Sequence, residues 1–343
     1  MTAYVVNSRS NTVTPIQVAT NTAGKAITVG VSPYAIAITP DGKTVYVGNQ
    51  DSRTVTPIRT ATNTAGPAIA VGRDPVAIAI TPDGKTAYVA NYRSGTVTPI
   101  RTATGVPGPA ITVGSGPSAI AITPGGTTAY VANDTAGTVT PIRTATNTAG
   151  RAIKVASGPA IIAITPDGRT ALVVSSTSDM VTPIRTATNT AGPPITVGRD
   201  PEAIAITPDG KTAYVANEGV GGLTPIQIAT GTAEPAINVG TAPDAIAISP
   251  DGKTAYVASQ GLVGHPGTVT PIQTATNQAG HAINAGSDPS ALAITPDGKT
   301  VYVADIGPFR SPANTVTPIR TATNTPGETI KVGTAPATIA ITP

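Results

Sequence analysis

The sequence lacks cysteine and tryptophan altogether and has a single phenylalanine among its 343 residues. Without cysteine the chain has no disulfides, thiolate nucleophiles, zinc–thiolate sites, iron–sulfur clusters or haem attached through cysteine. Charged residues make up only 11% of the chain, and the net charge is +3, with no run of Lys or Arg. We therefore expect no nucleic-acid partner.

Long apolar runs are absent as well. None approaches the roughly 18 residues of a membrane-spanning helix, so no membrane span is expected. No basic segment followed by an apolar stretch opens the sequence, because residues 3–7 already belong to a repeat. We expect the protein to be cytoplasmic, or extracellular or at the cell surface if a leader has been removed.

Glycine and proline are abundant, with 36 and 34 residues, and the apolar residues are mainly Ala, Val and Ile. This composition favours many short strands joined by turns over long helices. The proline of a Pro-Asp-Gly-Lys type of turn recurs at steps of 42 residues five times, and then at steps of 46 and 47. The prolines are Pro40, Pro82, Pro124, Pro166, Pro208, Pro250, Pro296 and Pro343. A fixed period of this length is the signature of a repeat architecture.

Each repeat contains four short strand signals. In the copy around Pro82 we predict strand a over 76–80, strand b over 86–90, strand c over 95–100 and strand d over 110–113. Asp-Gly between two apolar runs is a strong hairpin signal, and four strands in about 42 residues is the size of one propeller blade. Such a sheet cannot bury both faces alone, so blades must stack.

Every strand signal occurs eight times, beginning with strand b and ending with strand a. The sequence therefore predicts one all-β domain over 1–343, an eight-bladed β-propeller of four-stranded antiparallel blades. We expect the C-terminal strand a, residues 338–342, to close the molecule by pairing with the N-terminal strands b, c and d. That arrangement leaves neither terminus as a free strand edge.

The repeated motif, PDGKTAYVAN followed by a short loop and GTVTPI, resembles the YVTN-type repeat of YncE-like β-propellers, known from archaeal surface-layer proteins and bacterial secreted proteins. The resemblance covers the whole chain. It departs from that family in blade number, which is usually seven, and in strand c, where Pro15, Pro57, Pro99 and their equivalents replace an aliphatic residue. Since proline cannot donate to a β-ladder, we expect strand c to be short, bulged or turned so that no partner needs the missing donor.

The two ends of the blades differ in variability. The a–b turns are nearly uniform, whereas the b–c loops change in every copy, so we place function at the end formed by the b–c and d–a loops. Ten acidic and six basic residues fall there, a net charge near −4, which predicts a mildly acidic face that favours cationic groups. Seven of the nine tyrosines sit in strand b and are expected to pack between blades, and the Asn that ends strand b is expected to hold a turn.

The candidate ligand-binding residues lie in these loops. The Arg-Asp-Pro sequence occurs in two d–a loops. One explanation is a local salt bridge or Asx-type turn. The other is a ligand clamp across the axial mouth, the opening at this end around which the blades are expected to stack. Insertions in two adjacent blades either are ordinary loop growth or form a wall beside the opening. The candidates are Tyr92, Arg93, Arg73, Asp74, Arg199, Asp200, Phe309 and Arg310.

Catalytic chemistry has few candidates. The two histidines, His265 and His281, fall at opposite ends of their blade, and no nucleophile-elbow sequence is present. His265 and Asp305 are the candidates for an acid or base. No metal-binding sequence pattern is present, so no cofactor is expected; Asp residues that converge at the axial mouth are the one arrangement that could hold Ca²⁺ or Mg²⁺.

The sequence thus favours a non-catalytic binding or scaffold propeller, a monomer that recognises a protein or small molecule through the varied loops. The alternative is a hydrolase, lyase or cyclase whose active site lies at the axial mouth of the same face. A third reading is a set of idealised or recently amplified repeats with little dedicated function.

Overall fold

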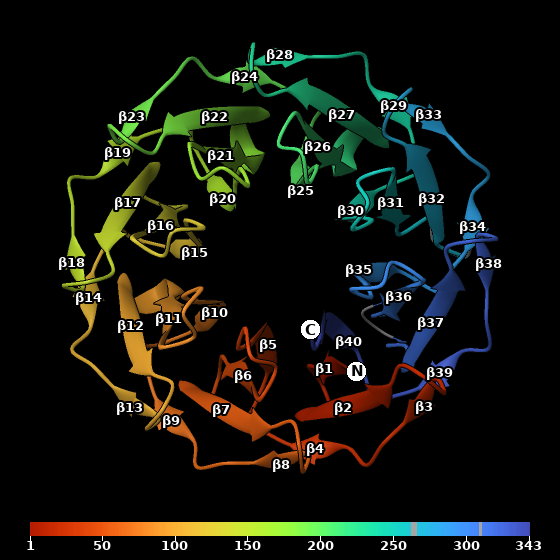
Figure 1. Cartoon of the computed structure of the whole chain (residues 1–343), viewed down its shortest axis with the longest axis horizontal. Helices are drawn as coiled ribbons and strands as arrows, with labels where there is room; N and C mark the ends of the chain where they lie inside the picture. The colour runs from red at the N-terminus through yellow and green to blue at the C-terminus, as the bar shows by residue number, and fades with distance from the viewer. Residues whose placement is uncertain (262–265, 309–310) are drawn as a thin grey trace. The chain divides into compact units, whose positions relative to one another are not determined.

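The computed structural model describes residues 1–261, 266–308 and 311–343, which form eight antiparallel sheets and three short 3₁₀ helices (Figure 1). The chain is an eight-bladed β-propeller, as the repeat predicts. Strand a of each blade is six residues long and begins at proline. These strands are β5 (Pro33–Ile38), β10 (Pro75–Ile80), β15 (Pro117–Ile122), β20 (Pro159–Ile164), β25 (Pro201–Ile206), β30 (Pro243–Ile248), β35 (Pro289–Ile294) and β40 (Pro336–Ile341).

Strands b and c are also six residues each and pair along their full length. The b strands are β1 (Thr2–Asn7), β6 (Thr44–Asn49), β11 (Thr86–Asn91), β16 (Thr128–Asn133), β21 (Thr170–Ser175), β26 (Thr212–Asn217), β31 (Thr254–Ser259) and β36 (Thr300–Asp305). The c strands are β2 (Thr12–Gln17), β7 (Thr54–Arg59), β12 (Thr96–Arg101), β17 (Thr138–Arg143), β22 (Met180–Arg185), β27 (Gly222–Gln227), β32 (Thr268–Gln273) and β37 (Thr315–Arg320).

Strand d consists of two pieces of two residues. In the copy around Pro82 the second piece lies within the strand predicted over 110–113, and the first piece, at 106–107, was not predicted. The first pieces are β3 (Thr22–Ala23), β8 (Thr64–Ala65), β13 (Val106–Pro107), β18 (Thr148–Ala149), β23 (Thr190–Ala191), β28 (Thr232–Ala233), β33 (Gln278–Ala279) and β38 (Thr325–Pro326). The second pieces are β4 (Ile27–Thr28), β9 (Ile69–Ala70), β14 (Ile111–Thr112), β19 (Ile153–Lys154), β24 (Ile195–Thr196), β29 (Ile237–Asn238), β34 (Ile283–Asn284) and β39 (Ile330–Lys331). The 3₁₀ helices η1 (Tyr92–Ser94), η2 (Ser176–Ser178) and η3 (Glu218–Val220) lie in b–c loops.

The chain divides into two compact units, residues 27–196 and residues 1–26 with 197–343. In the first unit the sheets are β5–β9, β10–β14, β15–β19 and β20–β24. In the second unit they are β25–β29, β30–β34, β35–β39 and the sheet ordered β3-β2-β1-β40. That last sheet joins the C-terminal strand a to the N-terminal strands, with Ala3 opposite Ile341 and Val5 opposite Ile339, as predicted.

The proline of strand c is accommodated without a bulge on the strand-b side. Pro99 lies opposite Tyr88 in an unbroken register, and its carbonyl accepts a hydrogen bond from Gly108 N at 2.7 Å. Because the N and C=O of a strand residue point to the same side, the proline nitrogen faces strand d. Strand d is interrupted there, between β13 and β14, so no acceptor waits for the missing donor.

The core lies between successive blades. Tyr88, Val97 and Ile111 of one blade pack against Ala129 and Val131 of the next, and Tyr88 is fully buried. Five other strand-b tyrosines repeat this packing, and they are Tyr46, Tyr130, Tyr214, Tyr256 and Tyr302. Large side chains on one sheet face thus meet small ones on the next, which is how Ala, Val and Ile can fill the core.

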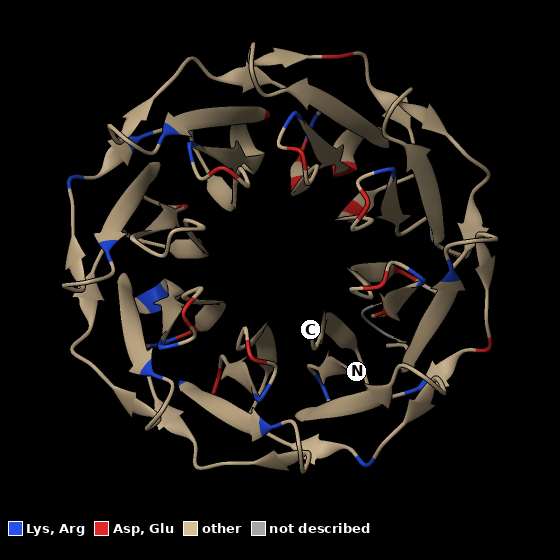
Figure 2. Cartoon of the chain, in the orientation of Figure 1, with Lys and Arg blue, Asp and Glu red and all other residues tan. Residues whose placement is uncertain are grey.

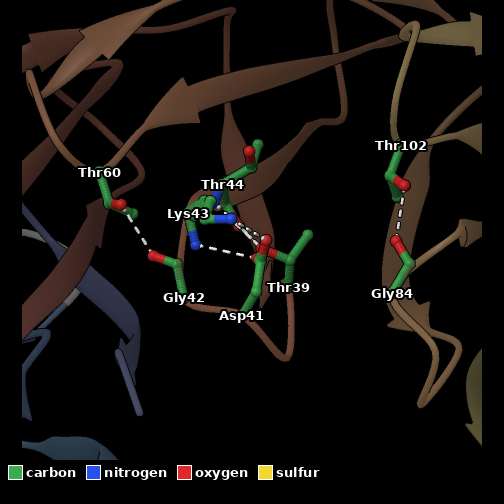
Figure 3. A network of polar contacts seen from close by, with 8 residues as sticks. All are labelled: Thr39, Asp41, Gly42, Lys43, Thr44, Thr60, Gly84 and Thr102. Atoms are coloured by element: carbon green, nitrogen blue, oxygen red, sulfur yellow. Dashed lines mark hydrogen bonds and ion pairs between the residues drawn. The ribbon is translucent and has the colours of Figure 1, made fainter.

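The a–b turn is held by a repeated polar network (Figure 3). The Thr39 hydroxyl donates to Asp41 Oδ1 at 2.6 Å, and the Lys43 backbone N donates to the same oxygen at 3.1 Å. These two hydrogen bonds, in that order of importance, hold the pKa of Asp41 below its ordinary value. The Thr60 hydroxyl, from the c–d loop, donates to Gly42 O at 2.7 Å. The uniform end of the blade is therefore a structural brace.

Candidate functional site

The varied end is built from b–c and d–a loops that are joined to each other by backbone hydrogen bonds. The first residue after strand b donates to the residue before the strand-a proline of the same blade, as Tyr92 N does to Asp74 O at 2.8 Å and Glu218 N to Asp200 O at 2.8 Å. A residue in the left-handed region precedes the proline, with φ of 61° at Asp74 and 51° at Asp200. These backbone hydrogen bonds fix the conformation of the loops without involving their side chains, so the side chains can vary between copies.

Three arginines come together at this end of the unit formed by residues 27–196. A pocket of about 280 Å³ is lined by Gln50, Asp51, Arg53, Arg73, Asp74 and Arg93. The two loops of one blade and one loop of its neighbour supply these residues. All six side chains are polar, so the pocket is suited to a charged or strongly hydrogen-bonding ligand.

The structure places Arg73, Asp74 and Arg93 around one pocket, and the ion pair there is not a local Arg73–Asp74 bridge. Arg93 Nε lies 3.4 Å from Asp74 Oδ2, so the ion pair joins the b–c loop to the d–a loop. Arg73 is tied through its backbone N, which donates to Ser94 Oγ at 2.7 Å. Its guanidinium group remains part of the pocket wall.

Tyr92 lies beside this pocket rather than in its lining. Its hydroxyl donates to Asp134 Oδ2 at 3.0 Å, on the b–c loop of the next blade. This bond links neighbouring loops and accounts for one tyrosine outside the strand-b pattern. A direct ligand contact by Tyr92 stays a prediction.

The second Arg-Asp pair, Arg199 and Asp200, belongs to the other unit and has acidic surroundings. The pKa of Glu202 is raised to about 7, first by burial and then by the charges of Glu218, Asp244 and Asp200. Burial also raises the pKa of Asp244, whose Oδ2 accepts a hydrogen bond from Gln260 Nε2 at 3.2 Å. The mildly acidic character predicted for the whole varied end is therefore unevenly distributed. Strands β25 and β30 carry acidic residues (Figure 2), whereas the arginine-lined pocket has three arginines and two aspartates.

The remaining candidates fall in or near the two insertions. His265, Phe309 and Arg310 lie outside the described residues, so their roles stay predictions. Asp305 ends strand b and is fully buried, and its Oδ2 accepts from Thr315 Oγ1 at 2.9 Å and Thr317 Oγ1 at 3.3 Å. Burial raises its pKa to about 7.

The Asn that ends strand b in other copies has a structural role. Asn91 is fully buried, and its Nδ2 donates to Thr96 O at 3.2 Å and Thr98 Oγ1 at 3.0 Å on the adjacent strand c. The side chain braces the start of the b–c loop from below. It is therefore closed to a ligand at the surface.

Within the part of the chain that the structure describes, no three His, Asp or Glu side chains gather closely enough to hold a metal ion. The same described residues contain no helix with the length and apolar character needed to span a membrane.

Sequence reasoning missed Gln50, Asp51 and Arg53 as pocket residues. A signal for Arg53 was present. The equivalent residue is Asn11, Gly95, Gly137, Asp179 and Gly221 in five other copies, and every one has a positive φ. Arg53 adopts the same conformation, with φ of 55°, although arginine has no preference for it.

Comparison with solved structures shows that the fold is shared. A hydrazine synthase structure from Kuenenia stuttgartiensis is 26% identical with a TM-score of 0.67, and the alignment covers 84% of this chain and 96% of that chain. The dihydro-heme d1 dehydrogenase NirN is 16% identical with a TM-score of 0.84, covering 99% of this chain and 74% of that one. A functionally unknown protein from Desulfotomaculum acetoxidans is 18% identical with a TM-score of 0.66, covering 99% and 98%.

No protein-family model matches the chain. No curated protein matches it either.

Proposed function

We propose that this chain is a non-catalytic binding propeller of the YVTN repeat type, which recognises its ligand through the b–c and d–a loops. The observation that carries the proposal is the pocket lined by Arg53, Arg73, Asp74 and Arg93 together with Gln50 and Asp51. The pocket is formed by b–c and d–a loops, whose sequence differs between copies, on strands and turns whose sequence is nearly the same in every copy. Loops on a rigid scaffold are the usual place for recognition residues.

Two further features support a binding role. The backbone below the pocket is held rigidly. Asn91 is buried beneath the b–c loop, where its side chain donates to Thr98, and the hydrogen bond from Tyr92 N to Asp74 O holds the d–a loop. A pocket preorganised in this way loses little conformational entropy when a ligand binds. Hydrazine synthase and the dehydrogenase NirN are enzymes by name, but a shared propeller fold does not carry their activities to this chain.

The YVTN assignment rests on the recurring motif PDGKTAYVAN and on the roles of its residues in the a–b turn and strand b. The resemblance also carries the proposal that the protein acts outside the cytoplasm or at the cell surface, as a monomer. Cell fractionation with an antibody to this chain tests the location. Recovery in the cytosol alone contradicts it.

The binding role is tested by replacing the pocket with loop residues taken from other copies of the repeat. The variant carries Gln50→Asp, Asp51→Thr, Ser52→Ala and Arg53→Gly, as at residues 134–137, with Arg73→Ser and Asp74→Gly, as at residues 115–116. Because every replacement residue already occupies the same frame position elsewhere in the chain, we expect the variant to fold.

Wild type and this variant are screened by saturation-transfer NMR against a library of anionic, cationic and neutral small molecules. We expect at least one class to bind the wild type and to be lost in the variant. A library whose binding to the two proteins is the same overturns the proposal.

A further inference from the structure

The arginine-lined pocket has an excess of cationic groups in an otherwise acidic set of loops. Three guanidinium groups, those of Arg53, Arg73 and Arg93, face two carboxylates, Asp51 and Asp74. We propose that this pocket binds a small oxyanion, a carboxylate or a phosphate ester, through Arg53 and Arg73. The inference rests on the proposed binding function and names the ligand class of that same site.

Both carboxylates in the pocket are already engaged. Asp74 Oδ2 lies 3.4 Å from Arg93 Nε, and the Ser32 hydroxyl donates to Asp51 Oδ2. Among the described residues, the guanidinium groups of Arg53 and Arg73 form neither an ion pair nor a side-chain hydrogen bond. Two planar groups that each present several N–H donors are thus available to the oxygen atoms of an anion.

Arg53 adopts the left-handed conformation that Gly, Asn or Asp adopts at the equivalent position of five other copies. Its φ is 55°, and a residue with a long side chain that cannot bond its own backbone gains nothing from the left-handed region. Non-glycine residues kept in sparsely populated backbone regions concentrate at binding sites, where the strain is offset by function. The observed outlier therefore points to a role for the Arg53 side chain beyond that of holding the turn.

The dimensions of the pocket restrict the ligand further. A volume of about 280 Å³ lies just below the usual range for small-molecule sites, and all lining side chains are polar. A compact, highly polar anion such as a di- or tricarboxylate or a phosphate monoester fits these properties. Arg53, Arg73 and Arg93 are exposed, so binding is expected to weaken as salt screens the charges.

The inference is tested by isothermal titration at low ionic strength and again at about 0.15 M salt. The probes are inorganic phosphate, glycerol phosphate, succinate and citrate, with the neutral diamide of succinate as the uncharged match. Arg73→Gln and Arg53→Asn are the site variants. Arg143→Gln, an exposed arginine at the end of β17, is the control with the same change in net charge.

We expect saturable binding of at least one anion to the wild type, no binding of the diamide, and a dissociation constant raised at least tenfold in each site variant. Arg143→Gln should bind as the wild type does. Arg53→Asn should also unfold at the same temperature as the wild type or higher, because Asn11 occupies this position in another copy. Binding to the phosphate probes alone identifies a phosphate ester as the ligand class, and binding to the carboxylates alone identifies a carboxylate.

The inference is overturned if no anion binds saturably, or if Arg143→Gln weakens binding as much as Arg73→Gln does. If the anions fail but a neutral or cationic compound is lost in the loop-replacement variant, the binding function stands and only the ligand class is wrong. If the loop replacement loses nothing, both fail together.

Discussion

Asp305 ends strand b where five other copies have Asn, and its carboxyl group is fully buried. Its pKa rises from 3.8 to about 7 because burial penalises the ionised form. In the unfolded chain the group ionises near its ordinary value, so the folded state loses stability as pH rises from about 4 to about 7 and is penalised fully above that range. Asp305→Asn should therefore stabilise the protein by roughly 2 to 4 kcal/mol near pH 8.

Urea unfolding of Asp305→Asn and wild type across this pH range measures the effect. The two proteins should be equally stable near pH 3.5, where Asp305 is largely neutral in both states. Asn91→Asp is the reverse variant, placing the same carboxyl group against Thr98 in another blade, and should lose stability as pH rises from about 4 to about 7. A stability difference independent of pH would contradict the burial explanation.

Tyr46 lacks a partner residue that its equivalents have. The hydroxyls of Tyr88 and Tyr130 bond to Asn147 at 2.5 Å and to Asn189 at 2.6 Å, whereas Gly105 takes the asparagine's place opposite Tyr46. Gly105 has φ of 67°, which asparagine tolerates, and a Cβ there would meet Ile69 at an ordinary 3.5 Å. Gly105→Asn should stabilise the protein by about 1 kcal/mol, through a new hydrogen bond and a less flexible unfolded chain.

A double-mutant cycle with Tyr46→Phe separates the two contributions to the effect of Gly105→Asn. Only the part that comes from the hydrogen bond should disappear when the hydroxyl is absent. An equal gain in both backgrounds would show that the introduced asparagine side chain never reaches the tyrosine.

The a–b turn is the element whose chemistry can be tested inside the molecule, because one copy lacks it. Gly125 stands where six other turns have Asp, has no positive φ, and leaves open space for a side chain. Gly125→Asp should restore the hydrogen bond from the Thr123 hydroxyl. Gly125→Ala is the control, expected to gain about 0.5 to 1 kcal/mol from chain entropy alone.

The aspartate should stabilise the protein more than the alanine at neutral pH. Its pKa in the fold is expected to be lowered, as that of Asp83 is by the Thr81 hydroxyl and the Lys85 backbone N. The extra stability is therefore present above the ordinary pKa and lost as pH falls through the lowered one. Thermal unfolding of both variants at neutral and acid pH checks this, and an advantage of Asp that persists in acid would refute it.

At the element scale, the sequence predicts what the chain encodes locally. The a–b hairpin follows from Asp-Gly between apolar runs, and the blade from the repeat of four strand signals. The division of strand d does not follow, because it depends on Pro99 of the neighbouring strand and on Gly108, whose N bonds the proline's carbonyl. That contact joins residues whose individual preferences reveal neither partner.

The residues that line the pocket could be predicted from the sequence only in part. Arg73, Asp74 and Arg93 could be found because they stand in rewritten loops, and the structure brings them together. Arg53 was harder to see, since its importance lies in the backbone conformation rather than in a motif. The net charge of the whole varied end does not show how charged residues are distributed among its loops, because a total does not say which of them are neighbours.

At the scale of the whole molecule, the first and last strands meet as an a–b hairpin without its turn. Thr342 N donates to Thr2 O at 3.0 Å, and Thr2 N donates to Thr342 Oγ1 at 3.0 Å. The same two bonds flank the intact turn between Thr81 and Thr86, at 2.9 and 3.1 Å. The fold at this blade therefore already has the geometry that a covalent turn requires.

A circular permutant should consequently fold. It joins Pro343 to Thr2 through Asp-Gly-Lys, with Met1 removed, and opens the chain between Gly125 and Gly126, in the a–b turn that lacks Asp. We expect a far-ultraviolet spectrum like that of the wild type and an unfolding temperature close to that of the wild type, because the new turn gains a Thr–Asp hydrogen bond that the opened turn lacks. A permutant joined through Gly-Gly-Gly is the matched control and should unfold at a lower temperature. Equal unfolding temperatures for the two linkers would show that the turn sequence contributes nothing at this blade, and an unfolded permutant would show that the pairing of β1 with β40 depends on an open chain.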